Sequence, residues 1–581
     1  MKSCPQCHRV ESDEALKFCR FDGTALVAAP ELVNAEAGTS RMNRASAAEE
    51  IETSILPQRS TTTDSQQSTK RITVRASDSG QNIERESNEQ KRSRLASPLV
   101  SIGLVAIVAV VAIYFYWSRD NNEINSIAVL PFTNATGDKE IDFLSEGVAE
   151  TLINNFTKIS DLKVTARSTA FRYRGREGEP QVVGRELGVG SVLSGKLLQR
   201  GDTLSIQVDL IKTSDGVQIW GDRYEGKSAD IVTIQQRIAS DVSTQLKLKL
   251  TGAQQQQITR TYTQNSQAYQ HYLRGRYHWN KRTAVDLRKG LQEFQSAADT
   301  DPGYALAYVG LADCYVLLEE YAGVPSSESL PKAQAFAEKA LQIDDSIGEA
   351  HATLGLVNNY LWRWSEAEAE LKRAIELNPN YPTAHHWYHG LLRDTGRFHE
   401  AFSEIKRAQE LDPLSAIIGT NVGSHYLAKR EPHSAVTEFN RILEFDPNWW
   451  AGHFFLGGAY LLLERNEEAV KELQKSVELS NRSGRTIGFL GYAHAVMGKR
   501  NEAQAILKEL ENKYSKREAI GQNIAAVHVG LGDKEQAFAW LEKDLLAHSG
   551  ELVRIRWYPP FDSLRSDPRY KDLMKRIGLP E

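Results

Sequence analysis

The chain has 581 residues, of which 41% are hydrophobic and 25% charged, and its formal net charge is -5. This length suggests about four folded units, and the hydrophobic content allows most of them to build cores. The small net charge argues against a nucleic-acid-binding protein, because such proteins usually present a strongly basic face.

Residues 1–27 hold three of the four cysteines, and their spacing predicts a small zinc ribbon. Cys4 and Cys7 form a C-x-x-C turn that places two thiolates on one tetrahedral metal, and a second turn offers Cys19 and Asp22. His8 is a rival fourth ligand. A segment this short has too little core to fold unaided, which favours one zinc ion per chain, measurable by elemental analysis, over a degenerate ribbon without metal. The grouped thiols also favour a reducing compartment for the N-terminus.

Two segments link this ribbon to the rest of the chain. Residues 28–96 are rich in Ser, Thr, Gln and Glu and poor in aromatic residues, so we expect a disordered linker. Residues 97–118 are predicted to form a transmembrane helix, because the nineteen residues of the run 99–117 include no charged side chain. At about 1.5 Å per residue, such a run matches the hydrocarbon thickness of a bilayer.

The charges beside this run predict its orientation. Basic residues precede it at Lys91, Arg92 and Arg94, whereas Arg119 on the far side lies beside Asp120. The positive-inside rule therefore places the N-terminus in the cytoplasm and everything after the helix outside it. This orientation agrees with the reducing compartment expected for the thiols.

Residues 124–252 are predicted to form an α/β domain. Helical spacing of apolar residues from Phe143 to Phe156, and strict alternation from Thr203 to Leu210, are typical of a packed helix and a half-buried strand. Asp215-Gly216 is a hairpin turn signal. The full set of expected elements is strands at 126–132, 162–166, 191–198, 203–210 and 217–220, and helices at 143–156, 180–187 and 229–249.

Several motifs of this region resemble the TolB-like (FlgO-like) domain of bacterial membrane proteins. They are Ile127 to Phe132, Phe143 to Gly147, Thr165 to Ser168, Leu187 to Gly190, and Leu210-Ile211 with Gly216, Trp220 and Tyr224. The resemblance implies a bacterial inner-membrane protein. That family often combines the domain with nucleotide-cyclase or winged-helix modules, but neither has room here, so no cyclase activity is carried over.

The C-terminal half repeats every 34 residues. Alanine recurs at this interval from Ala367 to Ala537, and Pro379, Pro413 and Pro447 each follow Asn or Asp. These residues resemble tetratricopeptide (TPR) repeats, helix–turn–helix units with this period. We expect about eight units over residues 265–549, with a longer turn at 280–283 in the first and an insertion at 323–327 in the second. Residues 550–581 are expected to cap the last unit.

The TPR resemblance implies a superhelix whose concave groove is lined by the first helix of each unit. Because the matching positions are mixed and partly aromatic, we expect them to hold an extended peptide or a partner's helix by apolar anchors. A groove filled by the chain's own segment is the alternative. The positions are Asn359, Tyr360, His386, Arg393, Thr420, Phe454, Arg485, Tyr492 and Gln522.

Three apparent sites are given structural interpretations. His385, His386 and His389 could suggest a metal, but His351, His385 and His453 occupy one repeat position, which favours packing between helices. Cys314 lies beside Leu311 and Tyr315 in a repeat helix, so we expect a core residue and not a nucleophile. Gly188, Gly190 and Gly195 lack the spacing of a dinucleotide-binding loop.

The predicted fold class is therefore multidomain: a small zinc ribbon, one transmembrane helix, an α/β TolB-like domain and an all-α TPR superhelical solenoid. The predicted function is a membrane-anchored scaffold, not an enzyme, that binds a protein or peptide partner through the TPR groove outside the cytoplasm. The alternative is a transmembrane signalling or transcription regulator with a cytoplasmic zinc-ribbon output module. Nucleic acid is disfavoured as a partner, because the ribbon's basic residues are offset by acidic ones. No small-molecule substrate is evident.

Overall fold

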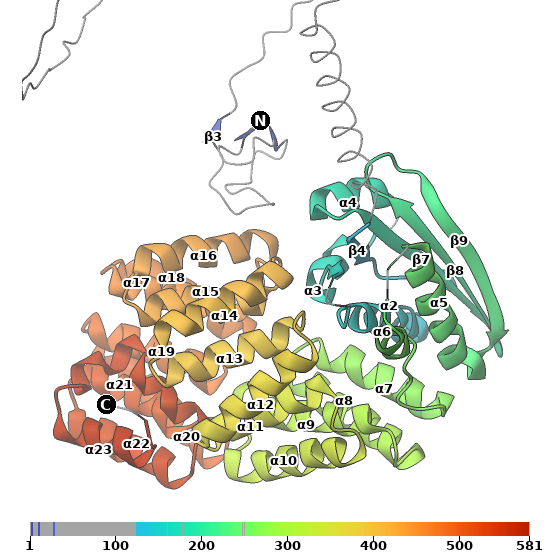
Figure 1. Ribbon diagram of the computed structural model, residues 1–581. Helices are drawn as coiled ribbons and strands as arrows, with labels where there is room; N and C mark the ends of the chain where they lie inside the picture. The colour runs from blue at the N-terminus through green and yellow to red at the C-terminus, as the bar shows by residue number, and fades with distance from the viewer. Residues whose placement is uncertain are drawn as a thin grey trace, which may run out of the picture. The chain divides into compact units, whose positions relative to one another are not determined.

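The computed structural model describes residues 2–3, 10–11, 27–28 and 124–579, apart from 160, 177, 247 and 249 (Figure 1). The predicted zinc ligands Cys4, Cys7, Cys19 and Asp22 and the predicted transmembrane helix at 97–118 lie outside these residues, as does nearly all of the predicted linker. Among the described residues, no helix is both long enough and apolar enough to cross a bilayer. Near the N-terminus, the short strands β1 (Lys2–Ser3), β2 (Val10–Glu11) and β3 (Val27–Ala28) pair antiparallel.

The α/β domain contains a mixed sheet in the order β6-β4-β7-β8-β9, with β5 paired to β7. Strand β4 runs parallel to β6 and β7, whereas β7, β8 and β9 form an antiparallel meander. The strands are β4 (Ser126–Val129), β5 (Thr133–Asn134), β6 (Lys163–Val164), β7 (Ser191–Arg200), β8 (Thr203–Lys212) and β9 (Gln218–Lys227). The helices are α2 (Asp142–Phe156), α3 (Arg167–Ala170), α4 (Pro180–Leu187), α5 (Ile231–Gln245) and α6 (Gly252–Ile258).

The alternation of apolar and polar residues along β8 determines which face of the sheet packs into the core. Leu204, Ile206, Val208 and Leu210 are fully buried and share one core with α2 and α5, while the residues between them are partly exposed. A separate cluster, which joins Val183 of α4 to Ala128 and Val192, covers the other face where β4 meets β7. The expectation of an α/β region joined to an all-α solenoid is confirmed.

Eight helix pairs follow in the described chain, each packed against the next (Figure 1). The pairs are α7 (Ser266–Trp279) and α8 (Ala284–Thr300), α9 (Ala305–Ala322) and α10 (Ser326–Ile343), α11 (Gly348–Tyr360) and α12 (Trp364–Leu377), α13 (Pro382–Asp394) and α14 (Phe398–Leu411), α15 (Ala416–Ala428) and α16 (Pro432–Phe445), α17 (Trp450–Leu462) and α18 (Asn466–Leu479), α19 (Gly484–Val496) and α20 (Arg500–Ser515), and α21 (Gly521–Leu531) and α22 (Lys534–Leu546). The tail forms the 3-10 helices η5 (Gly550–Arg556) and η6 (Pro559–Leu564) and helix α23 (Pro568–Arg576).

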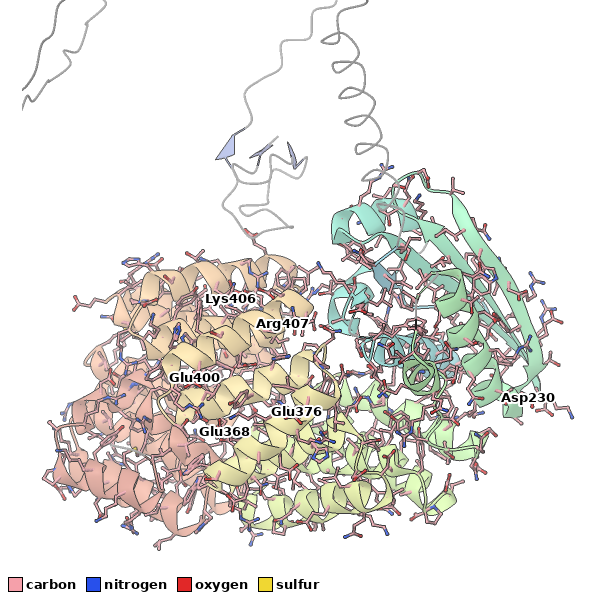
Figure 2. All side chains as sticks on the ribbon, in the orientation of Figure 1. Asp230, Glu368, Glu376, Glu400, Lys406 and Arg407 are labelled. Carbon is pink, nitrogen blue, oxygen red and sulfur yellow. The ribbon has the colours of Figure 1, made fainter. Side chains whose placement is uncertain are left out.

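The repeated small residues lie where the two helices of a pair come closest. All six period alanines from Ala367 to Ala537 are fully buried. A Cβ atom on Gly355 or Gly457 would lie 2.6 Å from the leucine side chain of the second helix, Leu371 or Leu473. The convex side carries charges instead, and Figure 2 shows Glu368, Glu376, Glu400 and Arg407 along α12 and α14. The period therefore reports a steric requirement inside each unit.

Two helix glycines provide a matched test of this requirement. A Cβ atom on Gly423 in α15 would clash with the buried ring of Phe439, whereas one on Gly390 in α13 would meet nothing within 4 Å. We expect Gly423→Ala to destabilise the protein by about 1–3 kcal/mol, because the core is overpacked. Gly390→Ala should stabilise it by about 0.5–1 kcal/mol through helix propensity. Thermal unfolding of both variants measures the difference, and equal melting temperatures would contradict it.

Candidate functional site

The α/β domain contacts one repeat position three times. Asn378, Asp412 and Asp446 precede the prolines of successive turns, 34 residues apart. Asn378 Nδ2 donates to Thr157 Oγ1 over 3.4 Å, Asp412 accepts from Thr169 Oγ1 over 2.7 Å, and Asp446 lies 3.6 Å from the guanidinium of Arg172. The turn residues thus both end a second helix and hold the α/β domain along the array.

A buried carboxylate joins the same domain to the first pair. Glu150 of α2 lies 2.7 Å from Arg167 Nε and 2.8 Å from Arg276 Nη2 of α7, and Asn280 Nδ2 donates to it over 2.9 Å. Burial raises the pKa of Glu150, but the charges of Arg276 and Arg167 outweigh burial and hold that pKa below its usual value. Glu150 is therefore an ionised link between α2, α3 and α7.

The array also closes on itself. Ser549, after α22, donates to Glu319 at the end of α9 over 3.1 Å, and the Gly550 amide donates to Ser326 Oγ over 3.1 Å. Arg485 of α19 donates to Glu320 over 3.0 Å. Gly323, at the insertion expected from the sequence, has φ +68°, and a Cβ there would lie 3.0 Å from the Glu518 backbone. The inserted turn is thus a contact with the end of the array.

The tail packs against the array at α11, α13 and α21. Trp557 Nε1 donates to Asp394 over 2.9 Å, and the guanidinium of Arg393 lies 4.0 Å from the centre of the Trp557 ring. Arg430 forms an ion pair with Asp562. The tail was expected to cap the last unit, and α23 does pack on α22, but η5 contacts α11 and α13 and η6 contacts α21. The chain's own tail therefore occupies part of the predicted groove, beside α11, α13 and α21.

A cavity of about 400 Å³ remains between these parts. Its walls come from α2 and α3 of the α/β domain, from the first helices of the pairs from α7 to α17, and from η5. Aromatic side chains line much of it, including Trp387, Trp449, Trp450 and Trp557. Seven arginines and five carboxylates also line it, and a volume of this size is typical of a ligand-binding site.

The nine predicted groove residues fall into two groups. Asn359, Tyr360, His386, Arg393, Thr420 and Arg485 line the large cavity. Phe454 is 1% exposed, with its ring centre 5.0 Å from that of Phe489 and 6.2 Å from that of Tyr558. Tyr492 packs on Phe489, and Gln522 is buried beside a small void next to Arg485. Tyr558 of the tail covers this second region, so the open groove ends near α17.

The repeat pattern did not indicate several residues that line the cavity. Arg167 and Arg172 come from the α/β domain, Arg282 from the turn inside the first pair, and Arg554 and Trp557 from the tail. The departure from the repeat at residues 280–283 was the sequence signal available for Arg282. Contacts between distant segments bring the others to the cavity.

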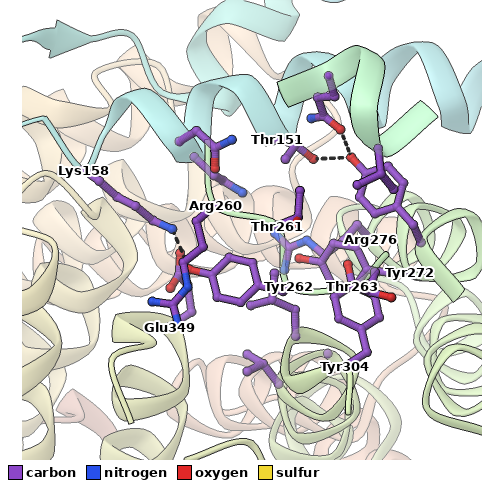
Figure 3. A pocket seen from close by; sticks show the side chains of 18 of the residues that line it. Thr151, Lys158, Arg260, Thr261, Tyr262, Thr263, Tyr272, Arg276, Tyr304 and Glu349 are labelled. Carbon is purple, nitrogen blue, oxygen red and sulfur yellow. Dashed lines mark hydrogen bonds between the residues drawn. The ribbon is translucent and has the colours of Figure 1, made fainter. Parts of the chain in front are cut away.

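A second pocket, of about 80 Å³, lies between α2, α5, the connection after α6, and the first two pairs (Figure 3). Tyr262 lies in its centre with Lys158 on one side and Tyr272 and Tyr304 on the other, and Lys158 Nζ donates to the Tyr262 hydroxyl over 2.9 Å. Burial raises the pKa of Asp313, in the wall, to about 6. Asn154, Arg276 and Tyr381 line both pockets, so the two adjoin.

The repeated histidines and Cys314, for which the sequence predicts structural roles, all lie in packed surroundings. Nδ1 of His351, His385 and His453 lies 2.6 Å from Glu370, Glu404 and Glu472, and Nε2 meets a backbone carbonyl in each case. One histidine–glutamate contact between the two helices of a unit is thus repeated three times. Cys314 is fully buried, and burial raises its thiol pKa far above the usual value, which suits a core residue.

Comparison with known proteins supports the repeat assignment. Residues 452–482, which span α17 and α18, match the family described as tetratricopeptide repeat. Residues 452–482 are therefore similar to one tetratricopeptide repeat. Residues 123–241 match the family described as HilA/YgeH-like transcriptional regulator, second domain. The TolB-like resemblance of the same region stays a prediction.

Curated relatives share only part of their length with this chain. Putative adenylate cyclase 3 of Rhizobium meliloti is 29% identical over 245 residues, which are 42% of each chain. Transcriptional regulator HilA of Salmonella typhimurium is 27% identical over 108 residues, 19% of this chain and 20% of HilA. The chain thus matches less than half the length of either protein.

Solved structures with some likeness include PilF of Pseudomonas aeruginosa and the human IFIT1 dimer with m7Gppp-AAAA. PilF is 21% identical with a TM-score of 0.29, over 37% of this chain and 93% of its own. The IFIT1 dimer is 13% identical with a TM-score of 0.38, over 54% of this chain and 77% of its own.

The contact between Ser549 and the buried carboxyl group of Glu319, which closes the array, predicts that the stability of the protein depends on pH. Burial raises the pKa of Glu319 from 4.5 to about 7. The hydrogen bonds of Ser326 and Ser549 and the charge of Arg485 lower this pKa, but burial outweighs them. A carboxyl group with a raised folded-state pKa contributes stability that is full below its unfolded pKa and is lost as pH rises through the folded one. Glu319→Gln should therefore raise the melting temperature at pH 8, by the equivalent of up to ~3 kcal/mol, and change it little at pH 4.5.

Glu376→Gln is the control, because Glu376 is an exposed residue of α12 in a surface ion pair with Arg373 (Figure 2). This variant should behave alike at both pH values. A Glu319→Gln protein that melts below the parent protein at pH 8 would contradict the ionised, buried carboxylate at the closing contact.

Proposed function

We propose that this protein is a membrane-anchored TPR scaffold that binds a protein or peptide partner in the open part of its groove. The cavity between α2, the first helices of the pairs from α7 to α17, and η5 supports this function, because it combines aromatic walls with six of the predicted groove residues. Large aromatic anchors in a partly enclosed surface are what partner recognition by a groove requires. No catalytic step is part of this proposal.

Membrane attachment and the zinc ribbon belong to the same proposal. The uncharged run 99–117 and the basic residues before it support one transmembrane helix with the N-terminus in the cytoplasm. Cys4, Cys7, Cys19 and Asp22 would hold a structural zinc ion there, whose role is to fold the short ribbon. The α/β domain and the TPR array would then lie outside the cytoplasm.

A second candidate function is a transmembrane regulator with the ribbon as its cytoplasmic output. The match of residues 123–241 to the second domain of HilA-like regulators favours it. A gel-shift assay with residues 1–96 and DNA separates the two functions. A DNA complex would support the regulator function. If the DNA stayed free at every protein concentration, the scaffold would remain the proposed function.

Partner binding is tested by photo-crosslinking in the full chain. A photoreactive phenylalanine analogue replaces Ile417, whose half-buried side chain lines the open groove, or Arg407 on the convex face of α14. We expect a discrete crosslinked partner from position 417 and none from 407, because only the groove offers apolar anchors. Substitution of Phe454 would not test the groove, since that ring is part of the core. Equal crosslinking from both positions would overturn the assignment.

Topology is tested by two reporters fused in turn after Glu581, one active only outside the cytoplasm and one active only within it. The proposal expects activity from the outside reporter alone. Activity from the cytoplasmic reporter would invert the orientation, and the groove would then serve cytosolic partners.

A further inference from the structure

Among the arginines that line the large cavity in the described part of the chain, one has no carboxylate within 4.0 Å, although Asp313 and Glu320 lie near enough to act on its charge. Seven arginines line it, and six have a carboxylate within 4.0 Å. Arg167 and Arg276 share Glu150, for example, and Arg393 pairs with Asp394. Arg282 is the exception: among the described residues its guanidinium has neither an ion pair nor a hydrogen bond. A cation in a partly enclosed site normally has a charged or hydrogen-bonding partner.

The backbone holds Arg282 in a defined position. It lies in the turn between α7 and α8 with φ +53°, a left-handed conformation that Trp362 and Arg430 also adopt in the turns of later pairs. Its guanidinium stacks on Trp279, 3.6 Å from the ring centre. Stacking on an aromatic face leaves the edge of the planar guanidinium, with its N–H donors, free to bind a ligand.

Two neighbouring groups add to the excess of donors. Trp279 is 5% exposed, and its buried indole N–H has no hydrogen-bond partner among the described residues. His386 of α13 lines the same cavity and likewise forms no hydrogen bond with them. Burial, followed by the charges of Arg282 and Arg393, lowers the pKa of His386 to about 4. Burial is the main cause of this shift, and the charge of Glu320 opposes it, so His386 is a neutral imidazole beside Arg282.

We propose that the Arg282 end of the cavity binds a small ligand through an oxyanion group, a carboxylate or a phosphate. The guanidinium edge matches the two oxygens of either group, and the indole N–H of Trp279 supplies a further donor. The cavity of about 400 Å³ accommodates a small molecule. The proposal is independent of partner binding, because it depends on the unpaired charge and not on the aromatic anchors.

The test is thermal unfolding of the full chain at constant ionic strength, with inorganic phosphate or citrate replacing chloride. The parent protein should show a saturable rise in melting temperature with at least one of the two anions. Without anion, Arg282→Gln should melt at a higher temperature than the parent protein, because an unpaired cation is removed. Its affinity for the anion should be about tenfold lower, or lower still.

Two variants separate recognition from folding. Trp279→Phe keeps the ring under Arg282 but removes the indole N–H, so it should weaken anion binding while the protein stays folded. Arg407→Gln, on the exposed convex face (Figure 2), should leave the anion response unchanged. A parent protein that responds to neither anion, or an Arg282→Gln protein that responds fully, would overturn the proposal. If an acidic peptide stabilised the protein through Arg282 and neither small anion did, the proposed small ligand would also be ruled out.

Discussion

The arrangement of this protein depends on one turn position used three times. Asn378, Asp412 and Asp446 each end a second helix and each bind the α/β domain. Because the turns are spaced by the repeat, the domain contacts consecutive units at matching points. The cavity exists because the domain rests on these turns and on α7, and so covers the concave side without filling it. Part of the groove has thus become the wall of a partly enclosed cavity.

Sequence reasoning recovers the parts of this structure that repeat or alternate. The alanine and glycine positions report close packing within each pair, and the alternation from Thr203 to Leu210 reports the half-buried strand β8. Both patterns arise from local geometry, which a single chain displays directly. Six of the predicted groove residues line the cavity for the same reason, since the first helix of a unit presents the same face each time.

The remaining features are contacts between residues far apart in the chain, and periodicity contains no information about them. Phe454 occupies a groove position in its own unit, but Tyr558, about a hundred residues later, covers it. Nothing in the repeat predicts that η5 passes beside α11 and α13. Arg282 differs, because the turn that carries it breaks the repeat pattern, and irregular positions in a regular array are where a distinct role can be sought.

Closure of the array changes how such a chain can unfold and evolve. In an open solenoid each unit touches only its neighbours, so the ends fray first and units can be gained or lost singly. Here the junction of α9 and α10 touches the chain on both sides of α21 and α22, through Gly323 at one point and Ser549 at another. The second and the last pair are therefore neighbours, and fraying of the last pair must break contacts with the second. Insertion or loss of a unit between these two pairs would separate their surfaces, so the closing contacts constrain the number of units from α9 to α22.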